Sequence, residues 1–495
     1  MPGTYILAID QSTQGTKGMV FDQQGRLVAR ADQAHEQIIN EKGWVEHNPV
    51  DIYHNVLMVA KKAVEQAGID KAQLAAVGIS NQRETSLAWN RETGEPIYQA
   101  IVWQCARGEE ICRRLAADGL AETIKAATGL PLSPYFSAAK LAWIVENVKN
   151  ASALMSQKNL CMGTIDTWLV YKLTKGQHFK TDFSNASRTQ LFNIRTLQWD
   201  AGICQSFGLE EHCLAQVCDS NASYGETDFD GWLEAPIPIR AVLGDSHGAL
   251  FGQQCCRPGM VKATYGTGSS VMLNIGDKPI FSTGGLVTSL AWSFDGSVEY
   301  VLEGNINYTG AVISWLKDRL GLIASAAETA ELAEDSNSQD KSYLVPAFTG
   351  LGAPHWDSEA TALLTGMTRV TGKNEIVRAA LDSIAYQIDD IVTLMQCEAG
   401  IAIQELRADG GPTKNRYLMQ FQADLLSIPV QVPVVEELSG MGAAYAAGIA
   451  IGLYDKKTIF EHIGHEKYQP QMPAKQRELK KRGWQAAVSQ TLHHA

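Results

Sequence analysis

The sequence predicts an α/β protein made of two similar halves, and three observations support this prediction. Residues 5–9 form an apolar run of strand formers, residues 10–17 a polar loop of small and hydroxyl side chains, and residues 18–21 a second apolar run before a turn. This succession is typical of a β-hairpin. Residues 260–274 repeat it in the second half of the chain. Amphipathic helical segments elsewhere in the chain complete the α/β pattern.

Helical periodicity organises much of the remaining chain. An apolar stripe with the helical period predicts long helices at residues 50–67, 138–150, 309–319, 374–396 and 440–452. No linker rich in proline or serine separates the halves, so we expect them to pack tightly and to hinge. We place the boundary near residue 250, which gives one domain of residues 1–250 and another of residues 251–495. Residues 325–340 are polar and are predicted to form a solvated surface segment.

Composition excludes several classes of protein. The 495 residues carry a net charge of −12, which argues against nucleic acid or an anionic membrane as the main partner. No run reaches the roughly 18 apolar residues of a membrane helix, and the N-terminus has a strand pattern and no signal-peptide pattern. The nine cysteines lack metal-ligand spacing, which is typical of free thiols in a reducing compartment. We therefore expect a cytoplasmic protein.

Common nucleotide-binding and catalytic motifs are absent from the sequence. The chain has no GxxxxGK[ST] phosphate loop, no GxGxxG after a strand, no protein-kinase HRD or DFG motif, and no HExxH or GxSxG. A nucleotide would therefore have to bind through the paired hairpin loops. The backbone N–H and hydroxyl groups of such loops can wrap a phosphate chain from both sides.

A third segment has features of a site for the nucleotide base. Residues 406–409 have a strand pattern, Gly410 and Gly411 follow, and residues 415–425 have a helical pattern. Two glycines at a strand–helix junction allow the backbone to approach a flat ring such as adenine. A plain β–α turn with a helix cap explains the same residues, and on this segment alone we favour that simpler explanation.

Candidate ligand-binding residues follow two apolar runs. Arg83 and Glu84 come after a strand predicted at residues 75–79, and they offer a donor and an acceptor to a polyhydroxy ligand. Trp103 ends another apolar run, where an indole can stack on the C–H face of a sugar. The simpler explanations are a surface ion pair for Arg83 and Glu84 and a core position for Trp103.

Two aspartates end predicted strands. Asp245 follows residues 239–243, and Asp10 holds the corresponding position in the first hairpin. A carboxylate at the mouth of a cleft can accept the proton of an attacking hydroxyl. Two such carboxylates suit one general base and one Mg²⁺ ligand, as phosphoryl transfer requires. Each aspartate by itself is also explained as a turn residue or a helix N-cap.

Two longer motifs resemble those of the FGGY carbohydrate kinases. Residues 135–147 and 362–382 fit the two patterns of this family at every constrained position. Further stretches resemble the glycerol kinases within the family, namely residues 43–47, 81–85, 101–105, 185–189 and 345–354. The resemblance covers essentially the whole chain. It implies two domains of the ribonuclease-H type, as in actin and the Hsp70 ATPase, with the active site in the cleft between them.

The resemblance also implies roles for individual residues. Asp245 is expected to be the general base, and Asp10 is expected to lie beside Mg²⁺. The polyol site is expected to contain Arg83, Glu84, Trp103, Tyr135, Asp245, Ser246 and Ser270. ATP is expected to bind at Thr13, Gln14, Lys17, Thr267, Gly310, Ser314, Gly411 and Asn415. The implied reaction is ATP-dependent phosphorylation of a terminal hydroxyl of a small polyol, by a homodimer or homotetramer.

Three departures from the glycerol kinases concern the ligands. Ser246 stands where they have Gln, Ser270 where they have Phe against the glycerol carbons, and Lys17 where they have Arg. Lys17 can still bind phosphate as a point charge. The two serines make the pocket wider and keep it polar. The substrate is then glycerol, if neighbouring side chains refill the space, or a larger four- or five-carbon polyol or ketose such as erythritol, ribitol, xylulose or ribulose.

A protein of another class is also compatible with this fold. An ATP-switched binding protein without catalytic activity can use the same two domains, as actin and Hsp70 do. The presence of Arg83, Glu84, Trp103, Tyr135 and Asp245 together argues against this alternative, because a non-catalytic switch has no use for a polyol pocket.

Overall fold

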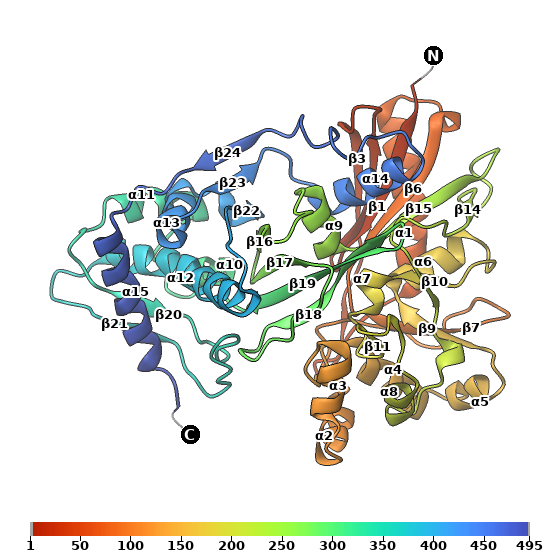
Figure 1. Cartoon of the computed structure of the whole chain (residues 1–495), viewed down its shortest axis with the longest axis horizontal. Helices are drawn as coiled ribbons and strands as arrows, with labels where there is room; N and C mark the ends of the chain where they lie inside the picture. The colour runs from red at the N-terminus through yellow and green to blue at the C-terminus, as the bar shows by residue number, and fades with distance from the viewer. Residues whose placement is uncertain (1–2, 494–495) are drawn as a thin grey trace.

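The first hairpin belongs to a six-stranded sheet in the computed structural model, which describes residues 3–493 (Figure 1). In spatial order the sheet contains β14 (Glu226–Thr227), β15 (Ile237–Gly244), β6 (Leu74–Asn81), β1 (Tyr5–Gln11), β2 (Gly15–Phe21) and β3 (Leu27–Ala34). β2 is antiparallel to both of its neighbours, β1 and β3, and β6 and β15 run parallel to β1. Asp10 and Lys17 are opposite each other in the strands, so the loop is shorter than the predicted residues 10–17.

The second hairpin starts a seven-stranded sheet with the same core order. This sheet contains β18 (Val287–Phe294), β19 (Ser297–Ile306), β17 (Ser269–Gly276), β16 (Val261–Tyr265), β22 (Leu406–Asp409), β23 (Val430–Pro433) and β24 (His465–Tyr468). β16, β17 and β19 are antiparallel neighbours, whereas β22 and β23 run parallel to β16. The series β19-β17-β16-β22-β23 therefore repeats β3-β2-β1-β6-β15. The predicted duplication of the hairpins is confirmed.

All five long helices predicted from periodicity are present. They are α1 (Pro49–Ala67), α4 (Ser137–Asn147), α10 (Gly310–Asp318), α12 (Lys373–Ala399) and α14 (Leu438–Ala450). Capping residues explain where α1 begins and ends. Asn48 accepts a hydrogen bond from Val50 N at its start, and Gly68 adopts a φ of 62° at its end.

One predicted surface segment contains a helix. Residues 325–340 include the short helix η3 (Ala326–Glu328) and α11 (Thr329–Glu334). A capping box between Ser325 and Glu328 starts the first turn, and Ala333 is buried against α12 and α13 (Arg416–Leu426). Most of the segment is exposed, as predicted, but it also contains a short helix that docks through the buried Thr329 and Ala333.

The other elements cover the sheets and their edges. A five-stranded sheet in the first half contains β4 (Ile38–Ile39), β5 (Val45–His47), β8 (Ala100–Ile101), β7 (Ser86–Asn90) and β9 (Leu160–Thr164). The remaining helices are α2 (Glu109–Ala117), α3 (Ala121–Thr128), α5 (Ala151–Ser156), α6 (Ile165–Leu173), α7 (Phe183–Ala186), α8 (Ala201–Ser206), α9 (Asp245–Gly252) and α15 (Ala474–Ser489). Short strand pairs join β10 (Lys180–Asp182) to β13 (Gln216–Cys218), β11 (Phe192–Asn193) to β12 (Gln198–Trp199), and β20 (Tyr343–Val345) to β21 (Leu363–Thr365). No helix of the described residues is long and apolar enough to cross a membrane.

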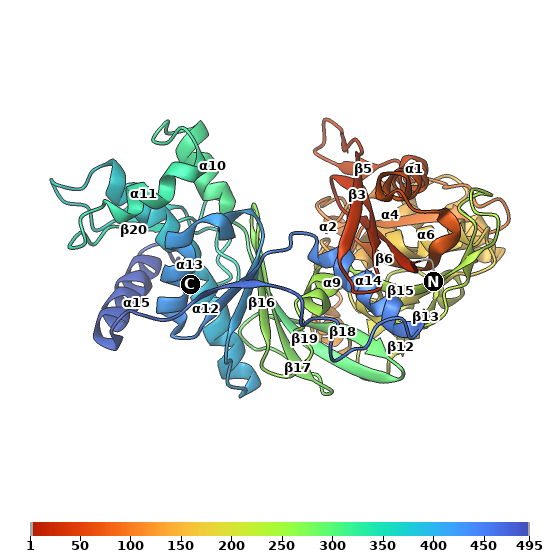
Figure 2. The same cartoon turned by 90° about the horizontal axis from the view of Figure 1, so that it is seen from above.

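Helix α14 returns to the first sheet although it comes late in the chain. Figure 2 shows α14 beside α9, β6 and β15, well away from α12 and α15. Met441 and Ala444 of α14 share a buried cluster with Ile6 and Ala8 of β1. A Cβ atom on Gly78 of β6 would lie 2.2 Å from Ala443 O, so only glycine allows this close approach. The core of the first domain is therefore completed by a helix from the second half of the sequence.

Candidate active site

Asp245 directly follows the last residue of β15 and is the first residue of α9. Its Oδ1 accepts hydrogen bonds from Ser246 N at 2.6 Å and from Ser246 Oγ at 3.3 Å. Arg83 Nε lies 3.5 Å from the same oxygen. The side chain is 33% exposed, and Oδ2 accepts no hydrogen bond from the described residues. One carboxylate oxygen is thus oriented by the protein, and the other is open to a ligand.

Four buried charged side chains form a network next to Asp245. Arg83 Nη1 and Nη2 donate to the two carboxylate oxygens of Glu303 at 2.9 Å each. Arg188 Nε donates to Glu84 Oε1 at 2.6 Å, and Arg188 Nη1 lies 3.1 Å from Glu303 Oε2. Each side chain is at most 6% exposed. The network balances two positive with two negative charges, as buried ion pairs require.

This network joins the two domains. Arg83 and Glu84 follow β6 of the first sheet, whereas Glu303 belongs to β19 of the second. Burial by itself would raise the pKa of Glu303, but the guanidinium groups of Arg188 and Arg83 outweigh this effect and hold the pKa well below its usual range. The simpler explanation of Arg83 and Glu84 as a surface ion pair was wrong, because both are buried.

Glu84 has an uncommon backbone conformation. Its φ is 60°, in the left-handed region that glutamate rarely adopts. Its carbonyl accepts hydrogen bonds from Ser86 Oγ at 2.8 Å and Ser137 Oγ at 3.2 Å, and these contacts hold the turn in place. Strain of this kind is found mostly at functional sites, where the surroundings fix one side-chain direction.

Trp103 and Tyr135 form an aromatic wall beside this network. Their ring centroids are 5.5 Å apart in an edge-to-face arrangement. Trp103 Nε1 donates to Thr13 Oγ1 at 2.9 Å, so the first hairpin loop contacts the aromatic wall directly. Burial, with Glu84 adding to it, raises the pKa of the Tyr135 phenol, which therefore stays protonated near neutral pH.

Lys140 fixes the backbone that carries Tyr135. This lysine of α4 is fully buried, and its Nζ donates to the carbonyls of Pro134, Tyr135 and Phe136 at 2.6, 2.5 and 3.0 Å. An ammonium group has three donors, and all three are used here. Burial lowers the pKa of Lys140 to about 7, although Glu84 opposes the shift. The position of Tyr135 thus depends on a lysine that titrates near neutral pH.

We expect Lys140→Met to raise the KM for the acceptor substrate at least about threefold while the KM for nucleotide stays unchanged, because Tyr135 loses the hydrogen bonds that hold its backbone. In the wild type, the KM for the acceptor substrate should rise as pH increases through about 7, since neutral Lys140 has two donors for three carbonyls.

The charged or titratable groups that influence the pKa of Lys140 are Glu84, Cys105, Cys112 and Arg107. Steady-state kinetics between pH 6 and 9 measure both effects, and a wild-type pH dependence that survives in Lys140→Met contradicts this assignment.

Asp10 and Lys17 lie side by side in the first hairpin. Asp10 is 5% exposed, and its Oδ1 has no hydrogen-bond partner among the described residues. Burial raises the pKa of Asp10 to about 6, a shift that Lys17 opposes and Asp245 increases. Lys17 Nζ lies 2.7 Å from Glu437 Oε2, just before α14. The lysine expected to meet phosphate is therefore paired with an acid in this structure.

The predicted nucleotide residues of the second domain meet at three backbone turns. Thr267 O accepts hydrogen bonds from Thr309 N at 3.0 Å and Ala311 N at 3.1 Å, and Gly310 N donates to Gly266 O at 2.9 Å. A Cβ on Gly310 would lie 2.6 Å from Gly266 O and 3.7 Å from Pro412. The loop after β16, the start of α10 and the turn after β22 are thus adjacent.

The turn after β22 combines the two features considered from the sequence, a pair of glycines that lets the backbone approach a ligand and a helix cap. Gly410 has a φ of 99°, and a Cβ there would lie 1.9 Å from Tyr265 O, whereas a Cβ on Gly411 would meet nothing within 4 Å. Asn415 caps α13 by accepting from Leu418 N at 3.0 Å, and its Nδ2 donates to Thr329 Oγ1 at 2.9 Å. The helix cap is therefore real, and open space above Gly411 accompanies it.

The remaining predicted positions differ in burial. The side chains of Gln14, Thr267 and Ser314 are exposed, and Ser314 Oγ donates to Gly310 O at 3.4 Å. Ser270 Oγ donates to Glu303 Oε1 at 3.2 Å, which places Ser270 next to the buried network. Sequence reasoning assigned no role to Arg188, Lys140 or Glu303. A single glutamate inside the apolar strand pattern of residues 300–304 was the one available signal for Glu303.

Comparison with known proteins assigns the family. The model of the FGGY family of carbohydrate kinases, N-terminal domain, matches residues 5–252, and the model of the C-terminal domain of the same family matches residues 261–451. The chain belongs to the FGGY family of carbohydrate kinases. As a member, this kinase is a phosphotransferase that acts on a hydroxyl group, and the alternative of a non-catalytic switch was wrong.

The chain is similar over its full length to several kinases of known type. It is 47% identical to the glycerol kinase of Chromobacterium violaceum over 493 residues, 99% of this chain and 98% of the relative. It is 46% identical to glycerol kinase 1 of Thermotoga maritima, over 99% of both chains. A solved structure of Plasmodium falciparum glycerol kinase with ADP aligns at a TM-score of 0.95 and 34% identity, covering 100% of this chain and 99% of that one. The predicted fold of two ribonuclease-H-like domains is confirmed.

Proposed function

We propose that this kinase transfers the γ-phosphoryl group of ATP to a terminal hydroxyl of a small polyol, and that glycerol is the first candidate acceptor. The observation that carries the proposal is Asp245, whose Oδ1 lies 3.5 Å from Arg83 of the buried Arg83–Glu303 pair and whose Oδ2 accepts no hydrogen bond from the described residues. A carboxylate so placed can accept the proton of an attacking hydroxyl. The similarity to glycerol kinases over the whole chain supports both the reaction and the acceptor.

Each predicted site residue has a place in this reaction. Asp245 orients and deprotonates the terminal hydroxyl for in-line attack on the γ-phosphorus. The other hydroxyls and the carbon chain bind to Arg83, Glu84, Trp103, Tyr135, Ser246 and Ser270. The nucleotide binds along Thr13, Gln14, Lys17, Thr267, Gly310, Ser314, Gly411 and Asn415. For Lys17 to reach a phosphate, its ion pair with Glu437 must loosen.

A Mg²⁺ ion would accompany the nucleotide, and Asp10 is the residue that fits it. The buried Asp10 Oδ1 lacks a hydrogen-bond partner, which suits a cation ligand. No group of three or more acidic, histidine or cysteine residues among those described forms a closed metal site. This agrees with the usual Mg²⁺ coordination by one or two carboxylates, water and substrate phosphate. When bound, Mg²⁺ neutralises the charge that develops on the phosphates.

A larger polyol or ketose is the second candidate acceptor. The hydroxyls of Ser246 and Ser270 both point to protein carboxylates, Asp245 and Glu303. Neither serine therefore refills the space that a Gln or Phe side chain would occupy. If no neighbouring side chain refills it, the site would also accept a substrate with four or five carbons, such as erythritol, ribitol, xylulose or ribulose.

A panel of acceptors tests the proposal. We expect ADP formation with ATP and Mg²⁺ to depend on added acceptor for at least one of glycerol, erythritol, ribitol, xylulose and ribulose. The ranking of kcat/KM then separates the two candidate acceptors, because one methylene or hydroxyl changes it about tenfold or more in a fitted site. If none of the five compounds stimulates ADP formation, the proposed function is wrong.

We also propose a homodimer or homotetramer, as the similarity to glycerol kinases implies. Light scattering of the purified protein distinguishes these states from a monomer.

A further inference from the structure

Three polar residues of the second sheet, Ser270, Glu303 and Asn305, form a row on one face of that sheet. Successive strand residues point to opposite faces, so Glu303 and Asn305 of β19 share one face. Ser270 of β17 is the direct partner of Asn305 in the register, and Met272 is the partner of Glu303. Residues directly opposite in an antiparallel pair also share a face. Ser270, Glu303 and Asn305 therefore lie together on one surface of the sheet.

Burial shows which way this surface faces. Met272 belongs to a core cluster that contains Ile6 and Ala8 of the first domain. Val271 and Leu302, which point to the opposite face, belong to the core of the second domain. The face of the sheet that carries Ser270, Glu303 and Asn305 is thus the face on which Met272 packs against the first domain.

Glu303 fixes the position of the row relative to the proposed polyol site. It binds Arg83, which lies 3.5 Å from Asp245. Val287 of β18 is opposite Glu303 on its other side and packs in one cluster with Phe136 and Tyr135. Asn305 lies two residues beyond Glu303, a distance of roughly 6–7 Å along a strand. Glu303 is fully buried and Asn305 is exposed, so the row leads from the buried network to solvent.

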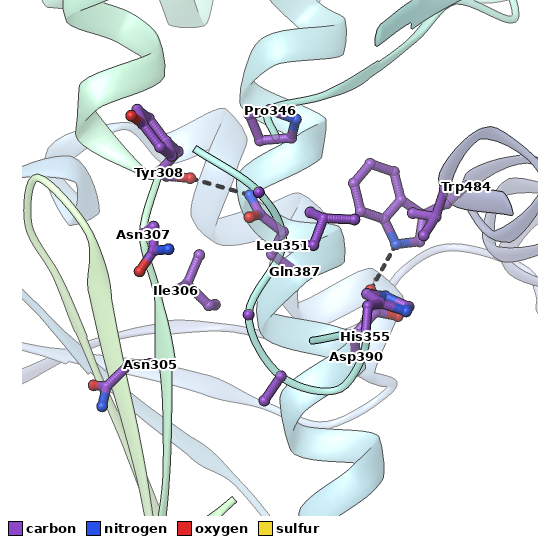
Figure 3. A pocket seen from close by; sticks show the side chains of 14 residues that line it. Asn305, Ile306, Asn307, Tyr308, Pro346, Leu351, His355, Gln387, Asp390 and Trp484 are labelled. Carbon is purple, nitrogen blue, oxygen red and sulfur yellow. Dashed lines mark hydrogen bonds and ion pairs between the residues drawn. The ribbon is translucent and has the colours of Figure 1, made fainter. Parts of the chain in front are cut away.

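The amide of Asn305 is free to bind a ligand. Its side chain makes no hydrogen bond to any other described residue. Asn305 is one of the residues that line a small cavity of about 30 Å³ with Ile306, Leu351 and Trp484, and Figure 3 shows its amide directed away from Leu351 and Trp484. Its neighbour Ser270 turns its hydroxyl to Glu303. A polar side chain without a hydrogen-bond partner among the described residues thus lies next to Ser270 of the proposed polyol site.

We propose that Ser270 and Asn305 form a subsite for the additional hydroxyl groups of an acceptor longer than glycerol, and that Asn305 determines specificity. This inference rests on the proposed function. In the proposed reaction Asp245, Arg83 and Glu84 supply polar partners for the three hydroxyls of glycerol, so those of a longer polyol need further partners. A primary amide supplies one acceptor and two donors, which match a hydroxyl in either direction. A hydroxyl buried there without a partner would cost binding energy.

Kinetics of two Asn305 variants test the subsite. Asn305→Ala removes the amide, and Asn305→Leu replaces it by an apolar group of similar volume. We expect both variants to lower the ratio of kcat/KM for erythritol or ribitol to kcat/KM for glycerol by about three- to tenfold, the effect of one hydrogen bond. Asn307→Ala is the matched control. Asn307 is exposed and lies two residues further along the chain, outside β19, and its substitution should leave the ratio unchanged.

Three outcomes overturn the inference. If both Asn305 variants remain active with an unchanged ratio, the subsite does not exist, whereas the proposed function stands. If their main effect is a higher KM for ATP, Asn305 belongs to the nucleotide site. If the wild type phosphorylates none of the acceptors, the proposed function fails and the subsite fails with it. Thermal unfolding of each variant identifies one that is misfolded, and the other Asn305 variant then decides.

Discussion

Replacing Asp245 by Asn is expected to lower kcat for acceptor-dependent ADP formation by about 10²- to 10⁴-fold. The amide has the same shape as the carboxylate, and its oxygen can still accept the hydrogen bond from Ser246 N. It cannot accept a proton from the attacking hydroxyl. Because Asp245 contacts only Ser246 and Arg83 among the charged or polar groups described, nucleotide binding should be retained. Steady-state kinetics and calorimetric titration with ADP measure the two properties separately.

Asp118→Asn is a suitable control for this substitution. Asp118 is an exposed residue at the C-terminal end of α2, and it takes part in no ion pair among the described residues. Its substitution makes the same chemical change far from the site and should leave kcat unaltered. A kcat within about threefold of the wild type in Asp245→Asn would contradict the role of Asp245 as general base.

Arg188→Met is expected to lower the free energy of unfolding by about 3–5 kcal/mol. Arg188 is fully buried and contacts both Glu84 and Glu303. Without it, two buried carboxylates share Arg83 as their remaining cationic partner, and methionine fills the volume without replacing the charge. Urea unfolding followed by circular dichroism measures the loss. Activity should fall as well, because Glu84 loses the hydrogen bond at 2.6 Å that orients its carboxylate.

The control for the stability loss in Arg188→Met is the same kind of substitution in an ion pair that is exposed to solvent. Lys414 and Glu436 are 3.0 Å apart with side chains 78% and 69% exposed. Lys414→Met should cost less than about 1 kcal/mol, because water and salt screen exposed pairs. A loss in Arg188→Met no larger than that in Lys414→Met would show that the buried network does not stabilise the fold. Adding Glu303→Gln to Arg188→Met should recover part of the loss, since it removes one unpaired charge.

The hairpins and long helices could be predicted because their patterns are local. Alternation of apolar and polar residues over a few positions predicts a strand, and a stripe with the helical period predicts a helix. These patterns placed Asp245 at a strand end and Asn415 at a helix start. They did not give the length of the first loop, because Asp10 and Lys17 are polar yet remain paired in their strands. Pairing within a sheet outweighed local composition at these two positions.

Much of the candidate site was recognisable from motifs, but its connections were not. Arg83, Glu84 and Trp103 stood out in the sequence, yet each also had a simpler explanation, and Tyr135 was indicated only by the family resemblance. Lys140 showed no sign of its three carbonyl contacts, because a lysine in an amphipathic helix is usually solvated. The strained backbone of Glu84 was equally hidden, since only the surrounding contacts hold it.

The sequence by itself determined the duplicated hairpins, the strand-end positions of the aspartates and the family. Each of these depends on residues close together in the chain. The tertiary structure alone decided that Glu303, 220 residues after Arg83, binds it across the two domains, and that α14 completes the first core. It also placed Asn305 beside Ser270. Contacts of this kind depend on how whole sheets pack and on which charges must be neutralised once they are buried. Local sequence patterns indicate neither the packing of the sheets nor the pairing of the buried charges.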